Sequence, residues 1–187
     1  MTKFERFDAT TAPADALPLI EKSEKAFGRL PGLHAVMAGS PALLEGYQVL
    51  HGLFAEKTAF DADEKTVVWQ TINVYHECHY CVPAHTGIAK MMGVSDEISN
   101  ALRDETPLPT EKLEALRTFT LAMLDTRGNP TEAAFDAFFA AGYEQRHVLD
   151  IILGLAQKVM SNYTNHVAQT PVDEVMQKFN WTPVSKR

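Results

Sequence analysis

Apolar side chains recur at three- and four-residue spacing along most of this chain, and glycine or proline interrupts the pattern at short intervals. This spacing places the apolar residues on one face of a helix. One series follows Ser40-Pro41, an N-cap residue and a proline suited to the first helical position, and consists of Leu43, Tyr47, Leu50 and Phe54. The pattern predicts an all-α fold, a helical bundle.

Helices are predicted over residues 15–27, 61–75, 79–92, 95–102 and 144–167. Further helices are predicted to begin at residue 41 and directly after the N-cap residues Thr110 and Thr131. The segment 61–75 contains β-branched residues, but no alternating run or hairpin partner lies nearby, so helix is favoured there. Residues 1–14 show little periodicity and are expected to form an extended arm. A loop is expected between residue 32 and Ser40.

Length and composition indicate a single globular domain over residues 1–187. Hydrophobic residues make up 45% of the chain and charged residues 22%, which is ordinary globular composition. The formal net charge is -7, so the chain lacks the excess of basic residues that is typical of nucleic-acid binders. We therefore expect no nucleic-acid partner.

The sequence suggests a cytoplasmic protein with no membrane partner. Residues 1–8 are charged and lack the apolar core of a secretory signal. The most apolar stretch, residues 148–155, contains Asp150 and falls short of the roughly 20 residues of a membrane span. The only two cysteines lie three residues apart, so they cannot form the framework of a secreted disulfide scaffold. Such a pair is more often catalytic or metal-binding.

The chemistry of the chain is concentrated in the segment Cys78-His79-Tyr80-Cys81-Val82-Pro83-Ala84-His85. Pro83 lacks an N–H and is tolerated in the first turn of a helix, which predicts a helix start between Cys78 and Cys81. Unpaired N–H groups and the positive end of the helix dipole favour the thiolate there. His85 lies four residues after Cys81, on the same helical face. We predict that Cys81 is the attacking sulfur, Cys78 the resolving one, and His85 the base or ion-pair partner.

Two other interpretations of the pair remain open. The two cysteines could form half of a zinc site with His85 and His166, although structural zinc sites usually contain a second close pair. They could also be inert buried side chains, because free cysteine is often buried.

The motif resembles the carboxymuconolactone decarboxylase superfamily, in its alkylhydroperoxidase AhpD-like branch, with the pattern E-x(11)-C-x-x-C-x-x-x-H. The residues that match are Cys78, Tyr80, Cys81, Ala84 and His85. The resemblance is strongest over residues 60–105, and residues 161–173 extend it loosely towards a longer, peroxidase-related subgroup. It implies a single all-α AhpD-like domain and a homo-oligomer, a trimer or hexamer.

The resemblance also implies a thiol-dependent peroxidase or disulfide oxidoreductase without a cofactor or metal. Its substrate would be a hydroperoxide or a disulfide, and a separate thiol reductant protein would restore the dithiol. In the family an upstream glutamate relays protons with the histidine, but Thr66 stands at that position here. Glu64 is two positions away. The candidate relay residues are therefore His166, His79 and Thr66 itself.

Two rival functions are consistent with the same residues. One is a redox-sensing or metal-holding helical oligomer whose cysteines register oxidation without turnover. The other is decarboxylase or lactone chemistry on the same fold, with His85 as general base. The second predicts that activity survives the loss of both cysteines.

Overall fold

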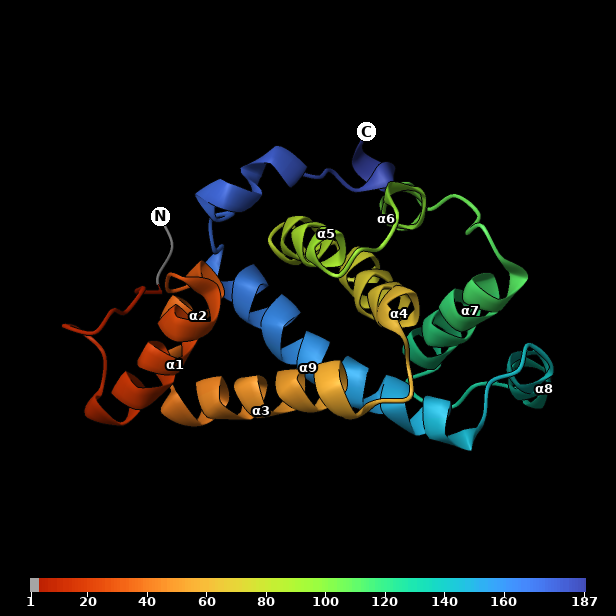
Figure 1. Ribbon diagram of the computed structural model, residues 1–187, viewed down its shortest axis with the longest axis horizontal. Helices are drawn as coiled ribbons and strands as arrows, with labels where there is room; N and C mark the ends of the chain where they lie inside the picture. The colour runs from red at the N-terminus through yellow and green to blue at the C-terminus, as the bar shows by residue number, and fades with distance from the viewer. Residues whose placement is uncertain (1–3) are drawn as a thin grey trace.

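The computed structural model describes residues 4–187, and this part of the chain is built from α-helices and short 3-10 segments without a β-strand (Figure 1). The all-α prediction is confirmed. The helices are α1 Leu17–Phe27, α2 Gly32–Met37, α3 Pro41–Lys57, α4 Ala62–Tyr75, α5 Cys81–Met91, α6 Asp96–Asp104, α7 Glu111–Asp125, α8 Glu132–Ala140 and α9 Gln145–Ala168, and the 3-10 segments are η1 Ala14–Ala16, η2 Glu174–Phe179 and η3 Val184–Lys186. No helix among residues 4–187 combines the length and the apolar character needed to cross a membrane.

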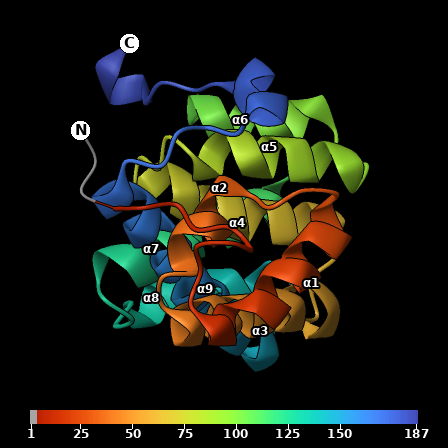
Figure 2. The same ribbon diagram turned by 90° about the vertical axis from the view of Figure 1, so that its left-hand side faces the viewer.

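Helix α4 occupies the centre of the bundle and packs against α5, α6, α7 and α9. Helices α3 and α9 pack against each other, with α1 and α2 at one end and α7 and α8 at the other (Figure 1). The C-terminal segment then returns over α5, where η2 packs (Figure 2). Through these contacts the motif helix α5 is enclosed by α4, α9 and the end of the chain.

Capping side chains mark the starts of α4, α6, α7 and α8. Asp61 and Glu64 form a capping box at the start of α4, where each side chain accepts a hydrogen bond from the other's backbone N–H. Ser95, Thr110 and Thr131 accept from the backbone N–H three residues on, as the sequence predicted. The observed starts therefore lie within two residues of the predicted ones.

The loop predicted between residue 32 and Ser40 is wrong, because Gly32–Met37 forms helix α2. All six of its residues are buried. A helix enclosed on every side has no polar face, and six residues are too few to reveal a helical period. Burial between α1, α3 and α9 stabilises this helix, and that packing is not visible in the local sequence.

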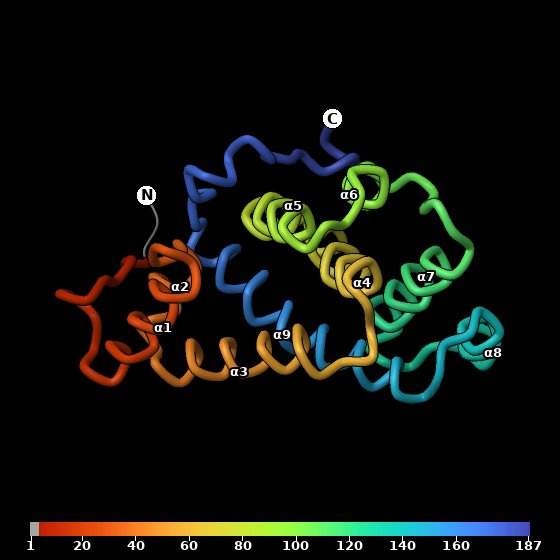
Figure 3. Tube along the Cα trace, viewed as in Figure 1, coloured from red at the N-terminus to blue at the C-terminus, as the bar shows by residue number. Residues whose placement is uncertain are grey.

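Residues 4–13 contain no helix or strand, but they are not extended throughout, because Asp8 to Ala12 form a hydrogen-bonded turn and η1 begins at Ala14; residues 1–3 lie outside the described part. The arm folds back beside α2, and the Phe7 N–H donates to the Ala35 carbonyl at 2.9 Å (Figure 3).

Two buried apolar clusters surround the elements that carry the motif. The larger one lies around α4, α7 and α8 and includes Phe54, Trp69, Phe119 and Phe138. The second cluster contains both cysteines together with Ile20, Leu33, Met37, Leu44, Tyr47 and Tyr80. The cysteine pair therefore lies inside the apolar interior, between α2, α3 and α5.

Candidate active site

The two cysteines lie at the start of α5, as the position of Pro83 predicted. Helix α4 ends at Tyr75, and Glu77 adopts a left-handed conformation with φ of 50° that turns the chain back towards α5. Both thiols are free, and the Cys81 N–H donates to the Cys78 sulfur at 3.3 Å. The turn therefore holds the two sulfurs next to each other.

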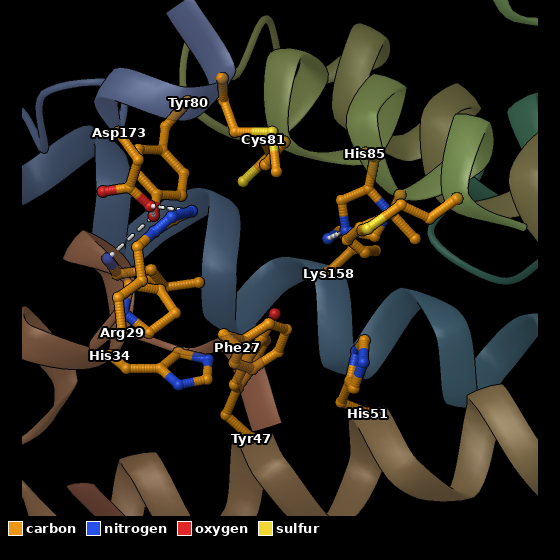
Figure 4. Close-up of a pocket in the computed structure, with 16 residues that line it drawn as sticks. Phe27, Arg29, His34, Tyr47, His51, Tyr80, Cys81, His85, Lys158 and Asp173 are labelled. Atoms are coloured by element: carbon orange, nitrogen blue, oxygen red, sulfur yellow. Dashed lines mark hydrogen bonds and ion pairs between the residues drawn. The ribbon is translucent and has the colours of Figure 1, made fainter. Parts of the chain in front are cut away.

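A cavity of about 90 Å³ reaches Cys81 from the side of α2 and α3 (Figure 4). Apolar and aromatic side chains form most of its wall. The lining residues that also carry chemistry are Arg29, His34, Tyr47, His51, Tyr80, Cys81, His85, Lys158 and Asp173. Cys78 is fully buried and is not part of the wall. A small molecule in the cavity would therefore meet Cys81 first.

The surroundings of Cys81 favour its thiolate. Burial raises the pKa of the thiol, but a hydrogen bond from Cys78, the charge of Lys158 and the amides of Asn165 and Asn162 outweigh it and lower the pKa to about 6. The Asn165 Nδ2 group donates to the Cys81 sulfur at 3.3 Å. Burial, followed by the interaction with Cys81, raises the pKa of Cys78. At neutral pH the pair thus consists of a Cys81 thiolate and a Cys78 thiol.

Lys158, from the middle of α9, is the buried cation of this site, and the sequence analysis did not predict it. Its side chain is fully buried, and within residues 4–187 no carboxylate lies at salt-bridge distance from it. Burial lowers its pKa, whereas the charges of Cys81 and Cys78 raise it. A buried lysine without a carboxylate is costly unless another anion compensates it. The Cys81 thiolate is that anion.

A signal for Lys158 was present in the sequence. Ile151, Leu155, Lys158, Asn162 and Asn165 follow one another at three- and four-residue spacing in the last helix. They therefore share one helical face, which begins apolar and becomes polar at Lys158. A lysine and two asparagines on a buried face indicate polar partners inside the fold.

His85 contacts Lys158. The charged group that lowers the pKa of Cys81 is Lys158 and not His85. The Lys158 Nζ lies 2.7 Å from His85 Nε2. The His85 ring also packs edge-on against Trp69, with 5.0 Å between ring centroids. Burial, the charge of Lys158 and His51 hold the pKa of His85 well below its usual range. His85 is therefore a neutral acceptor for the ammonium group.

None of the three candidate relay residues lines the cavity. Thr66 is buried in α4, one turn before Trp69. His79 is bound through Nε2 to the Thr170 carbonyl at 2.9 Å. His166 is half-buried, and burial followed by His79 and His76 lowers its pKa.

Glu64 does not line the cavity either. Its side chain takes part in the capping box of α4 and forms an ion pair with Lys112 at 2.9 Å. The zinc interpretation finds no support either, because residues 4–187 contain no group of three or more His, Cys, Asp or Glu side chains that could hold a metal.

Asp173 connects the C-terminal segment to the rim of the cavity. Its carboxylate accepts hydrogen bonds from the Tyr80 hydroxyl at 2.7 Å and the Gly32 N–H at 3.0 Å. It also forms an ion pair with Arg29 at 3.5 Å. Tyr80 stands between the two cysteines in sequence, so this carboxylate ties the cysteine turn to the end of the chain. Figure 4 shows these groups on one side of the cavity and Lys158 with His85 on the other.

The fold and the cysteine pair together define a helical dithiol protein with the AhpD-like fold. No protein-family profile matches the sequence, and no curated protein matches it. Solved structures do match over nearly the whole chain, at identities of 16–18%.

One similar structure is the alkylhydroperoxidase AhpD core of an uncharacterized peroxidase-related protein from Ralstonia eutropha JMP134. It has a TM-score of 0.81 and 17% identity, over 94% of this chain and 96% of that chain. An uncharacterized peroxidase-related protein from Silicibacter sp. TM1040 has a TM-score of 0.76 and 16% identity, over 94% and 95%. The debrominase Bmp8 in complex with 2,3,4-tribromopyrrole has a TM-score of 0.77 and 18% identity, over 95% of both chains. The AhpD-like fold that the motif predicted is confirmed.

Proposed function

We propose that this protein is a thiol-dependent peroxidase that reduces small organic hydroperoxides through Cys81 and Cys78. The observation that carries the proposal is the position of the Cys81 sulfur at the wall of a cavity, next to a second thiol and to the charge of Lys158. A thiolate is the nucleophilic form of cysteine, and a neighbouring thiol can convert its oxidised form into a disulfide.

In the first step the Cys81 thiolate attacks the terminal oxygen of the hydroperoxide. An S–O bond forms and the O–O bond breaks, so that sulfur is oxidised to a sulfenic acid and the peroxide is reduced to an alkoxide. The alkoxide needs a proton. The Lys158 ammonium is a buried acid whose charge acts on the Cys81 sulfur, and its hydrogen bond to His85 orients it. Lys158 therefore donates this proton to the alkoxide.

In the second step Cys78 attacks the Cys81 sulfur. The S–S bond forms, hydroxide leaves from sulfur, and the proton of the Cys78 thiol converts it to water. An external dithiol then supplies two electrons and two protons, and it restores both cysteines by thiol–disulfide exchange. The contact between the Cys81 N–H and the Cys78 sulfur supports this step, because the attacking sulfur is already within the same turn. The cycle needs no cofactor.

The shape and lining of the cavity favour a small substrate with an apolar body. Its volume of about 90 Å³ lies well below the roughly 300–1,000 Å³ of pockets for drug-sized ligands. Phe27, Leu33, Ile88 and Met91 contribute apolar wall, while Lys158 and His85 provide the polar end next to Cys81. An alkyl group would fit the first set and a peroxide group the second.

A second candidate is reductive removal of halogen from a small aromatic ring. The aromatic and apolar cavity wall favours it, and one similar fold is a debrominase. The Cys81 thiolate would take the halogen, so that the carbon–halogen bond breaks, a sulfur–halogen bond forms, and the ring carbanion takes a proton from Lys158. Cys78 would then displace halide and form the disulfide. The electron balance is the same as for a peroxide.

The test measures consumption of tert-butyl hydroperoxide and of 2,3,4-tribromopyrrole, each with excess dithiothreitol. Wild type should turn over the hydroperoxide many times, and Cys81→Ser should be inactive. Cys78→Ser should accumulate a sulfenic acid at Cys81 when the dithiol is omitted. Turnover of the halopyrrole alone would establish the second candidate.

The same assay separates the rival functions. A single oxidation per chain without turnover would support a redox sensor. If activity on a lactone or carboxylic acid survived loss of both cysteines, the proposal would be wrong.

A further inference from the structure

His34 lies on the wall of the cavity, and its side chain is almost completely buried. The residue belongs to α2, and its exposed fraction is 6%. The ring packs edge-on against Phe27 and Tyr47, with 5.6 and 5.5 Å between ring centroids. Figure 4 shows the His34 ring directed towards these two side chains, at the end of the cavity away from Lys158. The proposed peroxidase chemistry makes no use of this histidine.

Hydrogen bonds behind the ring fix which nitrogen of His34 carries the hydrogen. The Ser23 hydroxyl oxygen lies 2.8 Å from the Leu19 carbonyl oxygen and 2.8 Å from His34 Nδ1. It also accepts from Gln48 Nε2 at 2.9 Å. Two oxygens at this separation need a hydrogen between them, and a carbonyl has none to give, so the hydroxyl hydrogen points at Leu19. The hydroxyl oxygen is therefore an acceptor towards His34, and Nδ1 donates to it.

The opposite ring nitrogen of His34, Nε2, is then an unprotonated acceptor. A neutral imidazole carries one hydrogen, and Nδ1 holds it. Burial, followed by the charge of His51, lowers the pKa of His34 to about 4, so the ring is neutral at pH 7. Within residues 4–187 no group donates a hydrogen bond to Nε2. A buried acceptor without a donor costs free energy, and a bound molecule in the cavity can remove this cost.

Other acceptors on the cavity wall already have donors. The Asp173 carboxylate accepts from the Tyr80 hydroxyl at 2.7 Å. The His85 Nε2 atom accepts from the Lys158 ammonium group at 2.7 Å. A ligand that brings a hydrogen-bond donor into the cavity therefore finds a free acceptor at His34, away from the reacting sulfur.

We propose that His34 Nε2 is the acceptor for a hydroxyl group on the body of the substrate. The inference deepens the proposed function, because it rests on a hydroperoxide whose peroxide group reaches Cys81. It narrows the substrate class to hydroperoxides that also carry an alcohol or phenol O–H. A hydroxyl group can donate to Nε2, whereas a fluorine or a methyl group in its place leaves the nitrogen unpaired. Such a site rejects the analogue that lacks the hydroxyl group.

The test compares the binding of phenol and of fluorobenzene, two rings of similar size, to the full-length reduced protein in the absence of peroxide. Titrations followed by NMR give a Kd for each, and the selectivity is the ratio of the two values. His34→Phe keeps an aromatic ring against Phe27 and Tyr47 but removes the acceptor. We expect the ratio to change about tenfold in favour of fluorobenzene, which is the effect of losing one hydrogen bond.

Two further variants separate the acceptor from the rest of the ring. His34→Gln is the rescue variant, because its amide oxygen can accept from close to the position of Nε2, and it should restore most of the selectivity. Ser23→Ala lies outside the cavity wall and removes the group that keeps the hydrogen on Nδ1. The tautomer with hydrogen on Nε2 should then gain population in ¹⁵N NMR spectra of His34, and the selectivity for phenol should fall.

His51→Phe is the matched control, because His51 is another histidine of the cavity wall and stacks on Trp69 at 5.5 Å between ring centroids. Its Nδ1 is enclosed and has no partner, so within residues 4–187 no hydrogen bond fixes the tautomer of this ring at Nδ1. The change should leave the ratio of the two Kd values in place.

An unchanged ratio in His34→Phe would overturn the proposal, and so would a loss of selectivity in His51→Phe alone. Failure of phenol to bind the wild type would overturn it as well. The titration needs neither peroxide nor reductant. Selective binding of phenol without turnover of hydroperoxide would therefore contradict the proposed function and leave the hydroxyl site at His34 established.

Discussion

Lys158 Nζ lies 2.7 Å from His85 Nε2, and both side chains are buried. The motif histidine thus faces an ammonium group, and the ammonium group stabilises the Cys81 thiolate. In the pattern that the sequence resembles, a glutamate would act with this histidine, but here Thr66 stands at that position and lies outside the cavity wall. The group that contacts this histidine is a cation from α9.

The first prediction concerns this cation. Lys158→Met keeps the volume of the side chain but removes its charge, so the Cys81 thiolate loses its electrostatic partner. A return of the Cys81 pKa from about 6 towards its ordinary value of 9.0 would leave about 1–10% thiolate at pH 7, so the reaction of Cys81 with hydroperoxide should slow about 10- to 100-fold. Stability should stay equal or rise, because a buried charge is removed. Lys90→Met, at an exposed lysine of α5, is the control in stopped-flow and melting measurements.

The second prediction concerns pH. The pKa of Cys81 is lowered to about 6, and only the thiolate attacks. The rate of the first step should therefore be level above this pH and fall as the pH drops through it, by about tenfold per unit well below the midpoint. A pH profile of single-turnover oxidation checks this. A midpoint near the ordinary value of 9.0 would mean that Lys158 and the amides do not act on Cys81.

The third prediction concerns the contact of Asp173 with Tyr80 and Arg29. Asp173→Ala removes the hydrogen bonds from Tyr80 and from the Gly32 N–H and the ion pair with Arg29, so the C-terminal segment should leave the cavity rim more often. Loss of these three contacts, of about 0.5–1.5 kcal/mol each, should raise the rate of Cys81 alkylation about tenfold or more at pH 8. Asp96→Asn, at an exposed carboxylate of α6, should have no effect on iodoacetamide labelling followed by mass spectrometry.

The fourth prediction concerns stability in acid. Burial, followed by the charge of His51, lowers the pKa of His34 from 6.5 to about 4. The unfolded chain binds this proton below pH 6.5, whereas the folded chain does so only below about 4. The stability contributed by neutral His34 is thus lost as the pH falls from 6.5 to 4, by about 1.4 kcal/mol per unit. His34→Phe should flatten this slope in urea denaturation at pH 7 and pH 5.

The fifth prediction concerns the crossing of α3 and α9. A Cβ atom at Gly154 would lie 2.7 Å from a ring carbon of Phe54 and 3.0 Å from Val68. Gly154→Ala should therefore lower the free energy of unfolding by about 1–3 kcal/mol. Gly52→Ala, in α3, meets no atom within 4 Å and should raise it by up to about 1 kcal/mol. Equal effects of the two changes in urea denaturation would contradict the close packing at Gly154.

The sequence was sufficient for the helices whose signals are local. Asp61, Ser95, Thr110 and Thr131 mark helix starts because a capping side chain bonds to the backbone only three residues away. The start of α5 at the cysteine pair was also predictable, because Pro83 restricts the backbone of its own turn. Helix α2 was not, since burial by other elements and not its own pattern holds it.

The sequence by itself determined that the chain is helical and that two cysteines and a histidine share the start of one helix. Only the tertiary structure decided what surrounds them. Lys158 and Asn165 lie more than 70 residues after the motif, and α9 brings them to the cysteine site by packing against α4 and α5. Capping and helical spacing act over a few residues, whereas the charge and the hydrogen bonds that set the state of a thiol act through space. Their partners are fixed only when the helices pack.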